Sequence, residues 1–421
     1  MSLLMGSDPN TSGLRVVGGS MRAPRFRATL PSAAVAALGV LLGAPAAWGA
    51  ISISGTCNAY NQSTNCANAE VVKVAVNGTL QAQTTTTLTG AFTIAAVTVA
   101  SGDVVTVFVD NVADANEAVA VTKYDGSGNI TGVLLYEEHL TVGSADNQNL
   151  TNTNLGNYDN SVSGDEDVFF EHNTSSFTCD GVASTTGLCV DGTGQSTQER
   201  LYIKTGNTLS PGGNVQTAKV QVVGTYTAGS ETLTLTGSGT GTSKPFLVSG
   251  TFTPSTGTVV YNSTSATEIR ANTTIPDYYN LSLIPAGTVT YTLTDSGFVE
   301  GALTIGDGSH ALTMDTTNVN AQWFFVGSTS SFTVAASAVL SEASASTTFR
   351  FSGPSGGTRT ITANGQNLGI VDTVTTWPGN PKPTGISPKA VTAAGLSPAR
   401  TNMSSVWWIS LILCSWNHNN Q

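Results

Sequence analysis

The sequence predicts an all-β protein in which an N-terminal β-sandwich is followed by a parallel β-helix, or β-solenoid. Thr, Val and Gly dominate the middle of the chain, which favours strands and turns over helices. Apolar residues alternate with a period of two over residues 90–110. Further along, a short motif returns at intervals of about 26 residues. Tandem β-sandwiches would produce similar strands and are the alternative fold.

The composition limits the partners that the protein can have. Charged residues make up 10% of the chain, and the net charge is −11. Binding to nucleic acid or to anionic lipid needs clustered Lys and Arg, so neither is expected. We expect the partner to be an extracellular glycan or another cell-surface protein.

Residues 1–49 are interpreted as an upstream extension followed by a signal peptide over residues 21–49. Arg22, Arg25 and Arg27 form a basic region, an apolar run over residues 33–42 follows, and small residues lead to a cleavage site after Gly49. The apolar run is too short to span a bilayer, so no integral membrane span is expected. The predicted location is therefore secreted, extracellular or at the cell surface.

The cysteines form two local pairs, which agrees with export. Cys57 and Cys66 lie nine positions apart, and Cys179 and Cys189 lie ten apart. Two disulfides in an oxidising compartment are predicted, because a zinc site would require closer Cys pairs or nearby His partners.

Residues 50–131 are predicted to form the β-sandwich. Strand-like stretches such as EVVKVAVNG and LTGAFTIAAVTVASGDVVTVFVD are separated by turns at Gly90 and Gly102. The pattern Gly90-x-Phe92-x-Ile94-x-x-Val97, followed by Gly102-Asp103 and a Val-rich strand, resembles the carboxypeptidase-regulatory-like (transthyretin-like) β-sandwich. In that family the module is an accessory domain without catalytic residues, so the resemblance implies a scaffolding or spacing role.

Residues 132–377 are predicted to form the β-solenoid with its N-terminal capping region. VVGTYT, LVSGTFT and FVEGALTI share a core around Gly224, Gly250 and Gly301, and FFVGST continues the series at Gly327. One turn of such a repeat cannot bury its own apolar face and must stack on its neighbours, so these glycines are expected in one column. Residues 199–366 resemble the β-solenoid regions of bacterial surface and adhesin-like proteins.

Residues 378–421 form a Pro-rich tail with Pro381, Pro383 and Pro388. Its apolar end is interpreted as a truncated or frame-shifted reading frame, or as a buried terminal strand.

Few residues suggest a chemical site, and no catalytic or cofactor-binding residue is predicted. Asp159, Asp165 and Asp167 are weak calcium candidates because Asp159-x-Ser161-x-Ser163-Gly164 imitates the start of an EF-hand loop, although Phe170 stands where the closing Glu belongs. Asp110, Asp114 and Glu117 form a similar acidic group. A solvated acidic loop is the favoured interpretation of both groups.

The sequence therefore predicts a non-catalytic structural or adhesive protein. A carbohydrate-binding protein is one alternative, with Tyr278, Tyr279 and Trp323 as glycan-contact candidates unless these rings pack in the core. A β-helix polysaccharide lyase or glycosidase is another, and it would need charges such as Glu268, Arg270 and Asp277 to converge on one groove.

Overall fold

The part of the chain that the structure describes is mostly β-strand, as the composition predicts. The computed structural model describes residues 49–174, 177–179, 182–184, 186–190, 199–271, 277–316, 323–325, 330–335, 338–340, 348–351, 359–362, 369–371 and 391–394. Within these residues the helices are single short turns: η1 (Asp114–Asn116), α1 (Asn152–Leu155), η2 (Gly156–Tyr158), α2 (Asn160–Ser163) and η3 (Gly241–Ser243).

The first strands form two facing sheets. A three-stranded sheet has the order β4-β1-β7, with β1 (Gly49–Asn58), β4 (Ala91–Val99) and β7 (Ile130–Tyr136). It faces β2 (Val71–Val76), β3 (Thr79–Thr85), β5 (Val104–Asp110) and β6 (Ala118–Lys123). Buried side chains from both sheets, among them Ile53, Ile94 and Val107, share one core cluster. This arrangement is a two-sheet sandwich; its assignment to a family stays a prediction.

One sheet joins the sandwich to the following coil. β8 (His139–Val142), β14 (Arg200–Ile203), β17 (Lys219–Val222) and β20 (Phe246–Val248) extend the sheet of β2, β3, β5 and β6 to eight strands. Strand β5 contributes to two cores: Val107 packs inside the sandwich and Phe108 packs inside the coil. The boundary expected at residue 131 falls inside β7.

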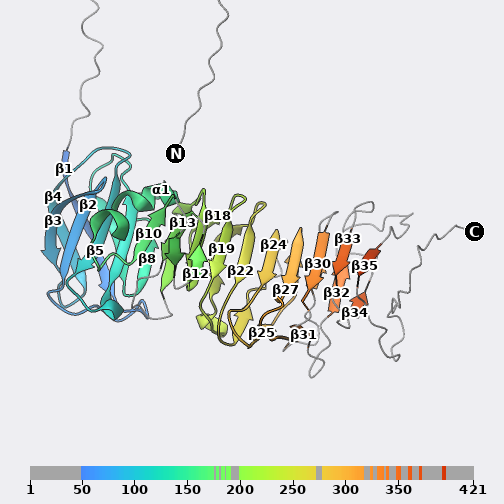
Figure 1. Cartoon of the computed structure of the whole chain (residues 1–421). Helices are drawn as coiled ribbons and strands as arrows, with labels where there is room; N and C mark the ends of the chain where they lie inside the picture. The colour runs from blue at the N-terminus through green and yellow to red at the C-terminus, as the bar shows by residue number, and fades with distance from the viewer. Residues whose placement is uncertain are drawn as a thin grey trace, which may run out of the picture. The chain divides into compact units, whose positions relative to one another are not determined.

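The coil is built from strands that pair in parallel with the equivalent strand of the next turn, as Figure 1 shows for the longest sheet. This ten-stranded sheet contains β10 (Phe170–Asn173), β13 (Gly187–Val190), β16 (Asn214–Thr217), β19 (Thr232–Leu235), β22 (Thr258–Tyr261), β24 (Asn280–Leu283), β27 (Ala302–Ile305), β30 (Ser330–Val334), β33 (Arg359–Thr362) and β35 (Val391–Ala394). All its pairs are parallel except β10 with β13.

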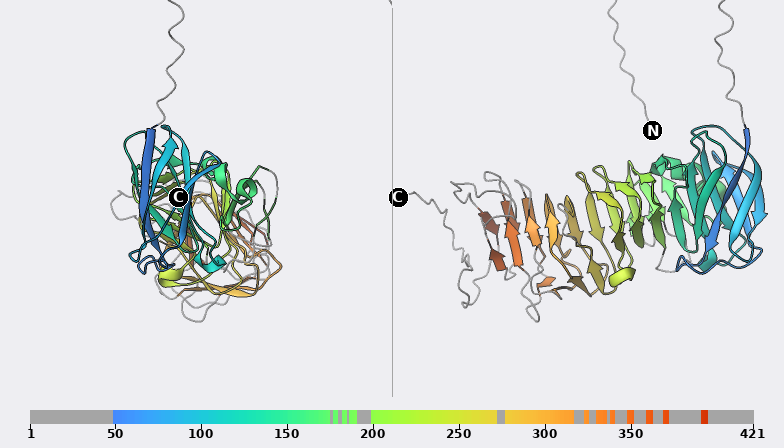
Figure 2. Two further views of the ribbon diagram at one scale, coloured as in Figure 1. Left: turned by 90° about the vertical axis from the view of Figure 1, so that its left-hand side faces the viewer. Right: turned by 180° about the vertical axis from the view of Figure 1, so that it is seen from behind.

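The other sides of the coil change partway along the chain. The early turns use the eight-stranded sheet and a four-stranded sheet of β9 (Asn149–Leu150), β15 (Thr208–Leu209), β18 (Thr225–Thr227) and β21 (Thr251–Thr253). After β22 the turns use two other sheets. Figure 2 shows these later turns from behind, in yellow to red. One holds β23 (Thr267–Ile269), β25 (Val289–Leu293), β28 (Leu312–Thr316) and β31 (Ala338–Leu340), and the other holds β26 (Gly297–Val299), β29 (Trp323–Phe325), β32 (Thr348–Phe351) and β34 (Gly369–Val371). A separate hairpin pairs β11 (Phe177–Cys179) with β12 (Val182–Ser184).

The coil core confirms the alternation read from the sequence. Inward side chains such as Leu201, Val220, Leu233 and Leu281 are buried in one continuous cluster. Each contributes roughly 1.5–3 kcal/mol when fully buried. No turn could bury these side chains alone, so the stacking of turns holds the coil together.

The predicted glycine column is right for two residues and wrong for the third. The amide of Gly224 donates to the carbonyl of Ile203 at 2.9 Å, and the amide of Thr251 donates to the carbonyl of Gly224 at 2.9 Å, so Gly224 and Gly250 stack at one corner. Gly301 instead precedes β27, and its amide donates to the carbonyl of Tyr279 at 2.7 Å. The change of sheets after β22 moves the Gly301 motif to a different corner of the coil. Gly327 lies outside the described residues.

Candidate functional site

Both predicted disulfides are present. The Cα atoms of Cys57 and Cys66 are 5.4 Å apart, and those of Cys179 and Cys189 are 5.8 Å apart. The second disulfide ties β11 to β13, where the carbonyl of Cys179 also accepts a 2.7 Å hydrogen bond from the Gln216 amide. Cys414 lies outside the described residues.

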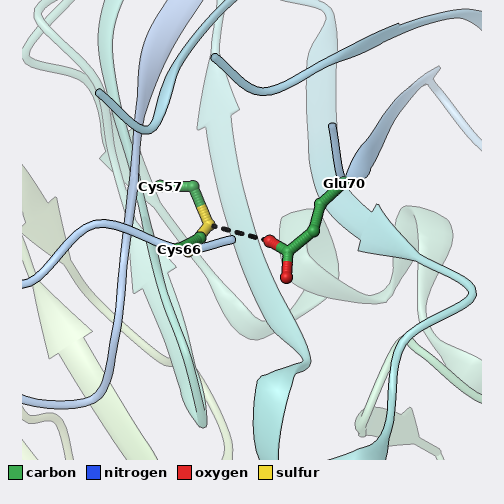
Figure 3. Close-up of side chains that lie close together, drawn as sticks. All are labelled: Cys57, Cys66 and Glu70. Atoms are coloured by element: carbon green, nitrogen blue, oxygen red, sulfur yellow. Dashed lines mark hydrogen bonds between the residues drawn. A yellow bond between two sulfur atoms is a disulfide. The ribbon is translucent and has the colours of Figure 1, made fainter. Parts of the chain in front are cut away.

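A carboxylate stands beside the first disulfide. Glu70 Oε2 lies 4.0 Å from the Cys57 sulfur, and Figure 3 shows the carboxylate pointing toward the disulfide. Two sulfurs and a carboxylate would form a metal-ligand set only if the cysteines were thiolates. Because they are joined in a disulfide, the group is a closed cross-link. Burial is the main cause that raises the pKa of the Glu70 carboxyl, and the Glu137 carboxylate raises it further.

The three predicted calcium candidates do not converge. Asp159 is fully buried and caps α2, where it accepts hydrogen bonds from the Val162 amide at 3.0 Å and from the His172 amide at 2.6 Å. The role predicted for Asp159 is therefore wrong, since both of its oxygens serve the local fold. Its helix-capping position explains the resemblance to an EF-hand start.

Asp165 and Asp167 meet Asp110 instead, so that their carboxylate oxygens lie within 4.8 Å of one another. The Lys73 ammonium is 2.6 Å from Asp110 Oδ1, and Asp167 accepts from the Asn111 amide at 2.8 Å. Burial raises the pKa of the Asp167 carboxyl. A lysine already supplies positive charge here, and the group fastens residues 165–167 to the end of β5.

The aromatic glycan-contact candidates are separated by burial. The Tyr278 ring is fully buried in the coil core, where its hydroxyl donates to the Arg270 carbonyl at 2.6 Å and lies 3.1 Å from the Tyr261 hydroxyl. A ring without exposed surface cannot stack on a sugar, so the candidacy of Tyr278 is wrong and its core alternative is correct. Tyr279 is partly exposed at the corner before β24. The side chain of Trp323 lies outside those that the structure describes.

The charges considered for an enzyme do not share a groove. Arg270 pairs with Asp277 at 3.3 Å in the interior, and its guanidinium lies 5.5 Å from the centre of the Phe246 ring. Glu268 pairs with Lys244 and also accepts from the Gly241 amide at 2.8 Å. These contacts form two separate structural ion pairs, each held by hydrogen bonds to the surrounding chain.

A buried polar layer is the feature that sequence reasoning missed. It consists of the outward side chains of three neighbouring parallel strands: His139 on β8, Arg200 and Tyr202 on β14, and Lys219 and Gln221 on β17. Burial lowers the pKa of His139 to about 3 and raises that of Tyr202 to about 12. Burial also lowers the pKa of Lys219. The sequence signal was the alternation of charged and aromatic residues along apolar strands, in a chain with only 10% charged residues.

The polar layer is covered by the loop that the first disulfide closes. This clasp loop, residues 57–66, leaves the end of β1 in the three-stranded sheet. Its Gln62 amide donates to Gln221 at 2.8 Å and lies 3.3 Å from His139 Nε2. Its Tyr60 hydroxyl accepts from Arg200 at 3.2 Å, and the Tyr60 and His139 ring centres are 5.1 Å apart.

A second surface carries short, uncharged side chains, most of them with hydroxyls. The outward positions of β19, β22, β24 and β27 on the ten-stranded sheet carry short side chains that stand opposite one another in register. We call this surface the hydroxyl face; its residues are Thr232, Thr234, Thr258, Val260, Asn280, Ser282, Ala302 and Thr304. The four-stranded sheet repeats the pattern with Thr208, Thr225, Thr227, Thr251 and Thr253.

Searches among protein-family models, curated proteins and solved structures found no match to this chain. Among the described residues, no helix has the length and apolar character needed to cross a membrane. The two disulfides fit an oxidising compartment.

Proposed function

We propose that the chain is a secreted or cell-surface protein with a structural or adhesive role, whose coil contacts an uncharged extracellular glycan. The hydroxyl face is the observation that carries this proposal. Parallel pairing repeats its side chains about every 4.8 Å along the sheet, on a backbone held by its own hydrogen bonds. Many weak contacts with a repeating polymer then add up to useful affinity.

The distribution of charge supports a neutral partner. The hydroxyl face contains none of the charged residues of the chain. The ionised groups near the coil interior, Arg270, Asp277 and Glu268, are engaged with structural partners. A non-catalytic role follows as part of the proposal, with the sandwich acting as a spacer, as its family resemblance implies.

Binding of the full chain to insoluble cellulose and chitin, and to a glycan array, tests the proposal. The variant Thr234→Lys/Thr304→Lys places two long cations on the hydroxyl face. We expect it to weaken binding by at least about tenfold, an effect of roughly 1.4 kcal/mol. The matched control is Thr292→Lys, which lies on β25 of a different sheet and is also partly exposed. Absence of binding to every glycan, or equal losses in both variants, would refute the proposal.

A further inference from the structure

The clasp loop joins two parts of the fold that are far apart in the sequence. It begins at the end of β1, whose sheet faces the sandwich core, and its tip lies on the outer side of the coil strands β8, β14 and β17. Inside the loop, the Ala59 amide donates to the Thr64 carbonyl at 2.7 Å and Asn58 forms a bridge with Asn65. The loop is thus a small hairpin whose two ends are tied by the disulfide.

The tip of this hairpin has a conformation that needs support. Gln62 has a φ of 62°, which is uncommon for a residue with a side chain. Its side chain nevertheless reaches Gln221 and His139, and together with the contact of Tyr60 with Arg200 these interactions fix the tip on the coil. These contacts are made by side chains alone, so the loop also gains from a constraint that limits its alternative conformations, and a short disulfide loop supplies one.

The polar layer below the clasp loop contains charged side chains, whose removal from water costs free energy. His139 is fully buried, and Arg200 and Lys219 are also buried. Two acidic residues that immediately precede β8 and β14, Glu138 and Glu199, are buried with them. Charges removed from water stay stable only while their partners remain in place. Loss of the cover would therefore favour entry of water into the layer.

We propose that the buried Cys57–Cys66 disulfide locks the clasp loop: it holds Tyr60 and Gln62 on β8, β14 and β17, and its reduction releases the loop and exposes the polar layer. In this step a small dithiol supplies two electrons and becomes a disulfide. The Cys57–Cys66 bond breaks, and each sulfur takes up one proton to become a thiol. The hydroxyl face lies on another sheet, so this proposal is independent of the proposed function.

The ionisation of His139 reports the position of the loop. In the locked state burial holds its pKa at about 3, with Arg200 and Lys219 lowering it further. The titratable and charged groups that face it are Tyr60 from the loop, Tyr136 from β7, Arg200 and Tyr202 from β14 and Lys219 from β17; the carbonyl of Glu137 and the Gln62 side chain contact its ring nitrogens. In the open state water reaches the imidazole, and its pKa returns toward the ordinary value of about 6.5.

An NMR pH titration of the histidine ring protons in the full chain provides the test. In the variant Cys57→Ser/Cys66→Ser we expect the His139 ring to titrate with a midpoint between about pH 5 and about pH 7. In the native chain we expect the ring to stay neutral above about pH 4. The control Cys179→Ser/Cys189→Ser removes the other disulfide and should leave His139 neutral. A folded Cys57→Ser/Cys66→Ser chain with a silent His139, or the same titration in the control, overturns the proposal.

A second measurement keeps the test decisive if the serine variant does not fold. The native chain is treated with dithiothreitol, and amide hydrogen exchange and free thiol at Cys57 are followed together by mass spectrometry. Exchange that rises around His139–Val142 in step with Cys57 thiol, while the strands β24 and β27 stay protected, supports the lock. Exchange that rises in all strands at once shows global unfolding instead and overturns it.

Discussion

At the residue scale, two fully buried tyrosines of the coil core differ in how their hydroxyls are satisfied. The Tyr226 hydroxyl has no hydrogen-bond partner among the described residues, whereas the Tyr278 hydroxyl donates to the Arg270 carbonyl at 2.6 Å. An unsatisfied buried hydroxyl contributes nothing to offset its lost hydration. Burial accordingly raises the pKa of Tyr226 far above its ordinary value.

We therefore expect opposite responses when each hydroxyl is removed. Tyr226→Phe should change the free energy of unfolding by less than about 1 kcal/mol or increase it, while Tyr278→Phe should lower it by about 1–3 kcal/mol. Urea unfolding of both variants beside the native chain measures the difference. Equal losses would show that the Tyr226 hydroxyl has a partner in solution, such as a bound water.

His139 makes a prediction about pH. The pKa of His139 is about 3 in the folded chain and about 6.5 in the unfolded chain. Between these two pH values the histidine is therefore protonated in the unfolded chain and neutral in the folded chain. The stability linked to His139 is complete above about pH 6.5 and falls as the pH drops toward 3, by up to about 1.4 kcal/mol per pH unit. His139→Gln should flatten that part of the stability curve. An unchanged slope in urea unfolding between these pH values would contradict the prediction.

At the element scale, the corner between the eight-stranded and four-stranded sheets requires glycine for lack of space. A Cβ added at Gly250 would lie 2.1 Å from the Gly224 carbonyl oxygen and 2.3 Å from that of Val223. Both neighbours are backbone atoms of the preceding turn and cannot move without opening the stack. At Gly287, in contrast, the nearest atom to an added Cβ would be 3.7 Å away.

Gly250→Ala should therefore destabilise the coil by about 2 kcal/mol or more, as overpacked positions do. Gly287→Ala should be neutral or slightly stabilising, because alanine restricts the unfolded chain. Thermal unfolding of the two variants provides the comparison. Similar melting temperatures for both would mean that the corner can relax.

The same corner shows what could be predicted from the sequence. Local patterns were sufficient for the strands, for the stacking of Gly224 on Gly250 and for both disulfides, because each depends on residues close together in the chain. Gly301 has the same local motif but another place, since the exchange of sheets after β22 has no local signal.

The sites were harder to predict for the same reason. Asp110 joins Asp165 and Asp167 across more than fifty residues, and the clasp loop reaches Gln221 across 159 residues. Periodicity identifies an outward side chain, but it does not say which loop covers it. The burial of Tyr278 likewise follows from the turn it enters, which its own neighbours in sequence do not reveal.

At the scale of the whole unit, the shared eight-stranded sheet couples the sandwich to the coil. Strand β5 supplies Val107 to one core and Phe108 to the other, so neither core can lose this strand alone. Long arrays of stacked repeats often unfold in parts, because each turn contacts only its neighbours. Here the common sheet and the clasp loop oppose such a separation between the sandwich and the first turns of the coil.

We therefore expect one unfolding transition for the sandwich and the adjoining turns. Ile94→Ala in the sandwich core and Leu235→Ala in the coil core should each lower the free energy of unfolding by about 2–5 kcal/mol. Because the transition is shared, each variant should shift the loss of hydrogen-exchange protection in both β4 and β19 to the same lower denaturant concentration. If Ile94→Ala released β4 while β19 kept its native midpoint, the two cores would be independent, and the joining sheet would be a hinge that transmits no stability.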